Sequence, residues 1–98
     1  MEKKEITEEA FKIIAFSGDA FDQYYKAVEV FKENNIVKSK EHLQNGDKFL
    51  NCAHQIQTCL IQEEVNGKDI PYSLVMTHAQ DHLTKATNWQ VIVNLLLK

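Results

Sequence analysis

The chain has 98 residues, which suits one domain over residues 1–98, with a modest core that self-association would help to stabilise. Its 11 Lys and Arg residues and 14 Asp and Glu residues give a net charge of −3, with the two signs interspersed. This distribution lacks the basic surface that nucleic acid or anionic lipid requires, so we expect no nucleic-acid partner.

Apolar and small residues recur at alternating spacings of four and three, as in amphipathic helices. The chain contains three Gly and one Pro and no alternating strand-like run, so the sequence predicts an all-α fold. The first helix is expected to end near Asn34-Asn35. Its predicted buried stripe consists of Ile6, Ala10, Ile13, Ser17, Ala20, Tyr24, Ala27 and Phe31.

Two further helices follow the same pattern. The second is expected to stop at Asn66-Gly67, and the third to begin near Ser73 and continue nearly to Lys98. Helices of about 25 to 30 residues, each about 40 Å long and joined by short links, predict an up-down-up antiparallel bundle. The predicted stripes are Leu43, Gly46, Leu50, Ala53, Gln57 and Leu60 in the second helix, and Val75, Ala79, His82, Ala86, Trp89, Val93 and Leu96 in the third.

The sequence also predicts the cellular compartment. The N-terminus lacks the apolar region of a signal peptide, and no apolar run approaches membrane-spanning length. Cys52 and Cys59 are separated by about two helical turns, roughly 10 Å, which is too far for a disulfide. We therefore expect a cytoplasmic protein with reduced thiols and without direct membrane insertion.

The most informative segment is V-M-T-H-A-Q-D-H-L-T-K-A, residues 75–86. Four of its polar residues stand at positions i, i+3, i+4 and i+7 of a helix and share one face: His78, Asp81, His82 and Lys85. A neutral imidazole is nucleophilic near physiological pH and can carry a phosphoryl group on a ring nitrogen, and Asp81 supplies a fixed charge nearby. This arrangement predicts a phosphoryl relay.

Phosphoryl transfer requires an in-line nucleophile and hydrogen-bond donors around three charged oxygens. Gln80 and His82 are expected to supply such donors beside His78. The chain has no P-loop signature, which is consistent with a carrier that receives an already activated phosphoryl group and does not bind ATP.

Three blocks of the sequence resemble the enzyme IIA component of the lactose/cellobiose family of the bacterial sugar phosphotransferase system. They are I-I-A-F-S-G-D-A at 13–20, A-H-Q-I-Q-T-C-L-I-Q-E-E-V-N-G at 53–67 and V-M-T-H-A-Q-D-H-L at 75–83. The resemblance covers the whole chain, and its last block is the most specific. Thr84 and Lys85 depart from the apolar or small residues usual in relatives, which affects the expected subunit interface.

The resemblance implies a three-helix protomer, a homotrimer that forms a nine-helix bundle, and a phosphohistidine at His78. It implies that His78 accepts a phosphoryl group from the histidine-containing phosphocarrier protein and passes it to a cysteine of the IIB component. The membrane IIC component would then import a β-linked disaccharide, which could be lactose, cellobiose or chitobiose. A divalent cation on the threefold axis would be held by Asp81, and Mg²⁺ suits carboxylates and water.

Other polar residues have simpler interpretations. His54 is expected to make a structural polar contact, His42 lies in a charged segment and is expected to be exposed, and Asp19 is expected to face water. Gly18 is expected to permit a close helix approach or a slight bend. Trp89 and the pair Tyr24 and Tyr25 are expected in the core or at a subunit interface.

Two other classes of function fit parts of the pattern. In a metal-binding bundle, His78 and His82 would form an i, i+4 metal pair, and Asp81 or His54 could add a ligand. This hypothesis lacks a second convincing chelating pair. A non-enzymatic helical adaptor would use the amphipathic helices as interaction surfaces, but it leaves the dense polar segment unexplained.

Overall fold

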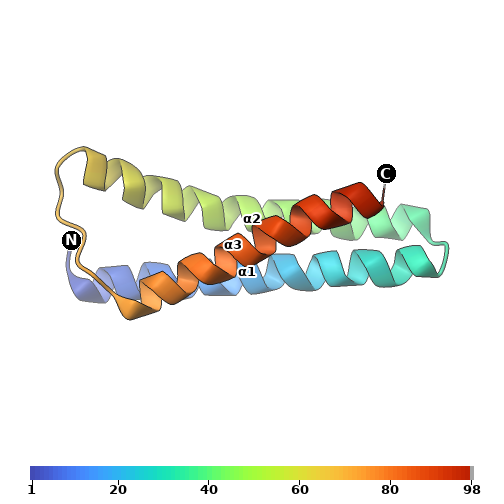
Figure 1. The fold of residues 1–98 in the computed structure, drawn as a ribbon, viewed down its shortest axis with the longest axis horizontal. Coiled ribbons are helices and arrows are strands. Elements are labelled where there is room, and N and C mark those ends of the chain that lie inside the picture. The colour runs from blue at the N-terminus through green and yellow to red at the C-terminus, as the bar shows by residue number, and fades with distance from the viewer. Residues whose placement is uncertain (98) are drawn as a thin grey trace.

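The computed structural model describes residues 1–97, and within this range it contains three α-helices and no strand. The helices are α1, Lys3–Lys32, α2, Ile36–Val65, and α3, Leu74–Leu96. Figure 1 shows that they run up, down and up, and the molecule measures 50 × 20 × 16 Å. The predicted all-α class and three-helix topology are confirmed.

The helix ends follow local hydrogen bonding. The Asn35 side chain accepts a hydrogen bond from the Lys38 backbone N–H at 3.1 Å, and Ser73 Oγ accepts one from the Met76 N–H at 3.2 Å. Each of these short polar side chains satisfies a backbone donor that has no partner inside the helix. After α2, Gly67 adopts a φ of 93°, which reverses the chain at little steric cost.

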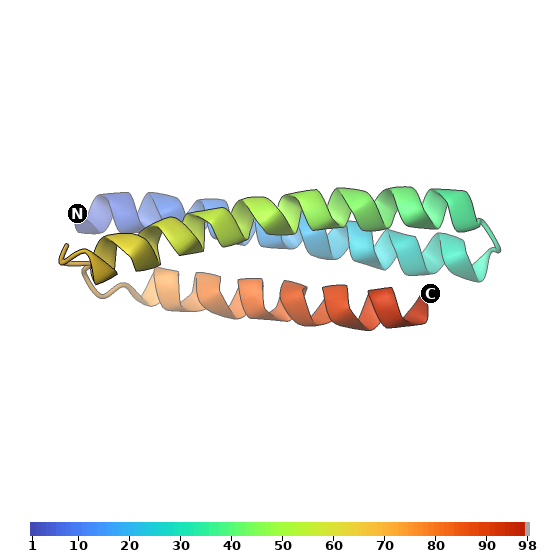
Figure 2. The same cartoon turned by 90° about the horizontal axis from the view of Figure 1, so that it is seen from above.

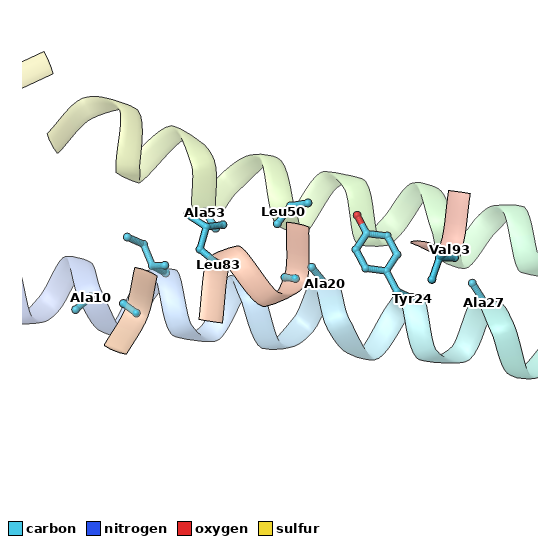
Figure 3. Packing of buried hydrophobic residues seen from close by; sticks show 11 residues of the cluster. Ala10, Ala20, Tyr24, Ala27, Leu50, Ala53, Leu83 and Val93 are labelled. Carbon is cyan, nitrogen blue, oxygen red and sulfur yellow. The ribbon is translucent and has the colours of Figure 1, made fainter. Parts of the chain in front are cut away.

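The predicted buried stripe of α1 is largely confirmed. Seven of its eight positions are buried, and Phe31 is half-buried. In α2, Gly46, Leu50 and Ala53 are buried as predicted. Figure 3 shows Leu50 and Ala53 of α2 and Ala20 and Tyr24 of α1 directed into the space that Leu83 and Val93 of α3 also enter.

The third helix differs from the prediction. Ala79, Ala86 and Val93 are buried as expected, but Leu83 is buried where the predicted stripe placed His82. Trp89 is 37% exposed and Leu96 is exposed. The prediction is therefore correct for every second position of the stripe, and it is wrong for the positions between them, where it named His82 and Trp89. The helix begins at Leu74, directly after the N-cap Ser73, as predicted, and it ends at Leu96, so its 23 residues are slightly fewer than expected.

A buried tyrosine links all three helices. A Cβ added to Gly46 would lie 2.5 to 2.9 Å from three atoms of the Tyr24 ring, so only glycine allows this close approach of α1 and α2. The Tyr24 hydroxyl donates a hydrogen bond to Asp47 Oδ1 at 2.7 Å, and Gln90 of α3 donates to the same oxygen at 2.9 Å. Gly18, expected to permit such an approach, instead faces open space.

Helix α3 packs more closely against α1 than against α2. Figure 1 shows α3 crossing the other two helices, and Figure 2, turned by 90°, shows it in a layer of its own. Besides the bond from Gln90 to Asp47, two further polar contacts join α2 to α3, from His54 to Thr87 and from Gln57 to Gln80. The remaining side of α3 faces outward.

Candidate functional site

The predicted histidine pair is formed on the outer side of α3. The Nε2 atoms of His78 and His82 are 3.0 Å apart, and the two rings meet edge to face with their centroids 4.5 Å apart. His78 is exposed and His82 is half-buried. At this distance one Nε2 must carry the proton and the other must accept it, so the two rings hold complementary tautomers when both are neutral.

Lys85 lies one turn beyond His82 and extends toward α1. Its Nζ lies 5.1 Å from the centroid of the Phe21 ring, within the range of a cation–π interaction. His82 and Lys85 also line a pocket of about 330 Å³ between α1 and α3. Asp19 and Asp22 line the same pocket from α1, and Asp19 is exposed to water as expected.

Gln80 is not brought to the histidine pair within this chain. Its Oε1 accepts a hydrogen bond from Gln57 of α2, and its Nε2 donates to Met76 Sδ at 3.2 Å. The reason is helical geometry, because positions i and i+2 lie on nearly opposite sides of a helix. Of the two predicted phosphate-site residues, the structure places only His82 beside His78.

Asp81 is exposed, one turn from His78 on the outer side of α3. Its carboxylate forms no ion pair or side-chain hydrogen bond within residues 1–97. A group of three or more His, Cys, Asp or Glu side chains able to hold a metal is absent from the same range. A metal-binding site within a single chain, built on the histidine pair with Asp81 or His54, is therefore not formed.

The other two histidines have structural partners. His54 Nε2 lies 3.1 Å from Thr87 Oγ1, as expected for a structural polar contact. His42 was expected to be exposed, but it is half-buried, with Nδ1 2.8 Å from Gln23 Oε1 of α1. The charged neighbours of His42 gave no sign of this cross-helix partner. Cys52 and Cys59 are free thiols.

Comparisons with known proteins identify the family. Residues 8–98 match the model of the family described as "PTS system, Lactose/Cellobiose specific IIA subunit". The PTS system lactose-specific EIIA component of Staphylococcus aureus (strain N315) is 35% identical over 83 residues, which cover 85% of this chain and 81% of that protein. This chain belongs to the lactose/cellobiose-specific IIA family. The lactose-specific EIIA component of Lactococcus lactis subsp. lactis is 28% identical over 98 residues, or 100% of this chain and 93% of that one.

Solved structures agree with this assignment of a IIA fold. The crystal structure of PtcA from S. mutans has a TM-score of 0.96 and 34% identity, covering 99% of this chain and 95% of that one. The PTS cellobiose-specific enzyme IIA from Bacillus anthracis has a TM-score of 0.89 and 29% identity, covering 99% and 87%. A phosphoryl-carrier role in sugar transport follows from the family. None of the helices described here for the IIA chain is long and apolar enough to cross a membrane.

The sequence analysis missed a second stripe on α3 of this IIA chain. Its members are all exposed and alternate at spacings of three and four: Leu74, Thr77, Asp81, Thr84, Asn88, Val91 and Leu95. The spacing is that of a coiled-coil seam, with apolar residues at the two ends of the stripe and polar residues in its middle. The same spacing is present in the sequence, but it shares the helix with the core stripe and contains fewer apolar residues. Asp81 stands in the middle of this outer stripe.

Proposed function

We propose that this IIA chain carries a phosphoryl group on Nε2 of His78. The observation that supports this proposal is the pair of Nε2 atoms 3.0 Å apart on the exposed side of α3. A nucleophilic imidazole nitrogen needs a free lone pair, and a neighbouring N–H can hold it in the required tautomer. His78 would carry its proton on Nδ1, and His82 would carry its proton on Nε2.

The first step would begin with a phosphohistidine of the histidine-containing phosphocarrier protein. The lone pair of His78 Nε2 attacks phosphorus in line, and the donor P–N bond breaks with its electrons returning to the donor imidazole. The His82 Nε2–H, which donates to His78 Nε2 before transfer, then donates to a phosphoryl oxygen. The chain needs neither ATP nor an additional base for this exchange.

The second step would pass the group to a cysteine of the IIB component. The cysteine thiolate attacks phosphorus, the bond from phosphorus to His78 Nε2 breaks, and the imidazole regains its lone pair. The IIB component would then serve uptake and phosphorylation of a β-linked disaccharide through the IIC component. The sugar would not contact this subunit, so lactose, cellobiose and chitobiose remain candidates, and transfer to a panel of IIB components would distinguish them.

We further propose that three chains assemble through the outer stripe of α3. Leu74 and Leu95 are 71% and 69% exposed, and a helix with such apolar residues at heptad spacing gains stability by packing against copies of itself. Threefold symmetry would bring three Asp81 carboxylates together, which repel unless a cation neutralises them. Carboxylate oxygens and water suit Mg²⁺, whose contribution would be to hold the subunits together.

Phosphate mapping tests the carrier role. The wild-type protein should take up acid-labile, alkali-stable phosphate from the phosphorylated phosphocarrier protein, and ³¹P NMR should show substitution at Nε2 of His78. His78→Ala should lose uptake and keep its helical content. The His54→Ala variant is the matched control and should retain uptake. Phosphate on another residue, or none in the wild type, would contradict the proposal and favour a helical adaptor.

A further inference from the structure

Lys85 is the one cationic side chain that lines the pocket beside the histidine pair, within residues 1–97. Asp19 and Asp22 also line the pocket, and Asp81 lies on α3 one turn from both His78 and Lys85. A phosphoryl group on His78 would add up to two further negative charges to this surface. Without a cation, the carboxylates would disfavour the phosphorylated state.

The ammonium of Lys85 is available for this purpose. It forms no ion pair within residues 1–97, although two carboxylates line the same pocket. The Lys85 Nζ instead lies over the Phe21 ring, 5.1 Å from its centroid, an interaction that is weak at an exposed site. Long side chains on a helix lean toward its N-terminus, which is the direction in which the histidine pair lies, and Lys85 lines the same pocket as His82.

From these contacts we propose that Lys85 binds the phosphoryl group carried by His78, an inference that rests on the proposed function. In the unphosphorylated chain the ammonium rests on Phe21. After phosphorylation of His78, it moves along the pocket edge and donates a hydrogen bond to a phosphoryl oxygen. His82 holds one oxygen and Lys85 holds another, and Lys85 offsets the charge of Asp19 and Asp22.

The test uses potassium phosphoramidate, which phosphorylates histidine without any protein partner. A nearby cation stabilises the dianion and therefore lowers the pKa of the phosphoryl group. In Lys85→Met, a ³¹P NMR titration should show that pKa about half a unit higher than in the wild type, a roughly threefold change in proton affinity. Lys85→Arg should restore the wild-type value, and raising the salt to about 1 M should remove most of the difference.

Lys40→Met is the matched control, because Lys40 is exposed near the start of α2, at the opposite end of the bundle from the start of α3 (Figure 1). An equal phosphoryl pKa in wild type and Lys85→Met, both loaded on His78, would overturn this inference alone. Failure of the wild type to accept phosphate from the phosphocarrier protein, while phosphoramidate still loads His78, would overturn the proposed function alone. A pKa difference between wild type and Lys85→Met that persists at high salt would also count against charge as the cause, and so would a Lys85→Arg variant with the same phosphoryl pKa as Lys85→Met.

Discussion

Replacing Tyr24 with Phe should destabilise the bundle by a predictable amount. Tyr24 is fully buried, and its hydroxyl donates a 2.7 Å hydrogen bond to Asp47. The substitution removes this donor while keeping the ring that packs on Gly46. The Asp47 carboxylate keeps its hydrogen bond from Gln90, and because it is only half-buried it also remains accessible to water.

The expected loss follows from the type of bond. Hydrogen bonds to charged groups contribute about 1.5 to 3 kcal/mol, and the remaining Gln90 partner favours the lower end. We therefore expect the free energy of unfolding at pH 7 to fall by about 1.5 kcal/mol. For a domain of this size, that loss should lower the melting temperature by roughly 6 to 12 °C.

The difference should also depend on pH. Burial, followed by the hydrogen bond and charge of Asp47, raises the pKa of Tyr24 well above its ordinary value of 10.0. Above pH 10 the unfolded chain releases this proton and the folded chain retains it, so the wild type loses stability as the pH rises. At pH 11 the loss is about 1.4 kcal/mol, which should nearly cancel the advantage of the wild type over Tyr24→Phe.

Urea denaturation at fixed protein concentration measures both effects. Tyr25→Phe is the matched control, because Tyr25 is 60% exposed and should change stability little at either pH. Equal stability of wild type and Tyr24→Phe at pH 7 would refute the energetic argument. A difference of the same size at pH 7 and pH 11 would refute the titration argument.

Three further predictions concern other parts of the bundle. Gly46→Ala should reduce stability by about 1 kcal/mol in urea denaturation, because overpacking against Tyr24 outweighs the gain of about 1 kcal/mol in helix propensity; a stabilised variant would contradict this. For the proposed trimer, sedimentation should show that a chelator weakens the wild-type assembly at neutral pH and that low pH restores it. The chelator should not change the assembly of Asp81→Leu. A wild type that is monomeric with Mg²⁺ present would exclude the axial cation. His54→Val should loosen α3, because Thr87 loses its partner on α2 and keeps only the Leu83 carbonyl of its own helix. Hydrogen exchange should then accelerate in α3 while α1 remains protected.

The sequence predicted α1 well because one stripe of that helix is buried along almost its whole length. The stripe of α3 was harder, since two registers with spacings of four and three share Ala79, Ala86 and Val93. One register continues through Trp89 and the other through Gln90. Hydropathy favours the tryptophan as the residue that faces the bundle. In the structure Gln90 faces it instead, because its side chain donates a hydrogen bond to a carboxylate of α2.

The candidate site shows the same limit. The His78 and His82 contact was predictable because residues four apart on a helix are neighbours. The same geometry should have excluded Gln80 from the pair. The contact between Lys85 and Phe21 was not predictable, because it depends on how α3 packs against α1 and joins residues 64 positions apart. Local spacing therefore predicts contacts within one helix, and packing determines those between helices.

The position of the histidine pair suits a carrier that serves two partners in turn. In the proposed relay, each partner would bring its own nucleophile or phosphoryl group in line with His78 Nε2, so this nitrogen has to be accessible from outside the bundle. It must also be held steadily, because the chemistry is mainly positioning. Helix α3 meets both needs, since Ala79 and Ala86 bury one side of it against the bundle and leave His78 exposed on the other.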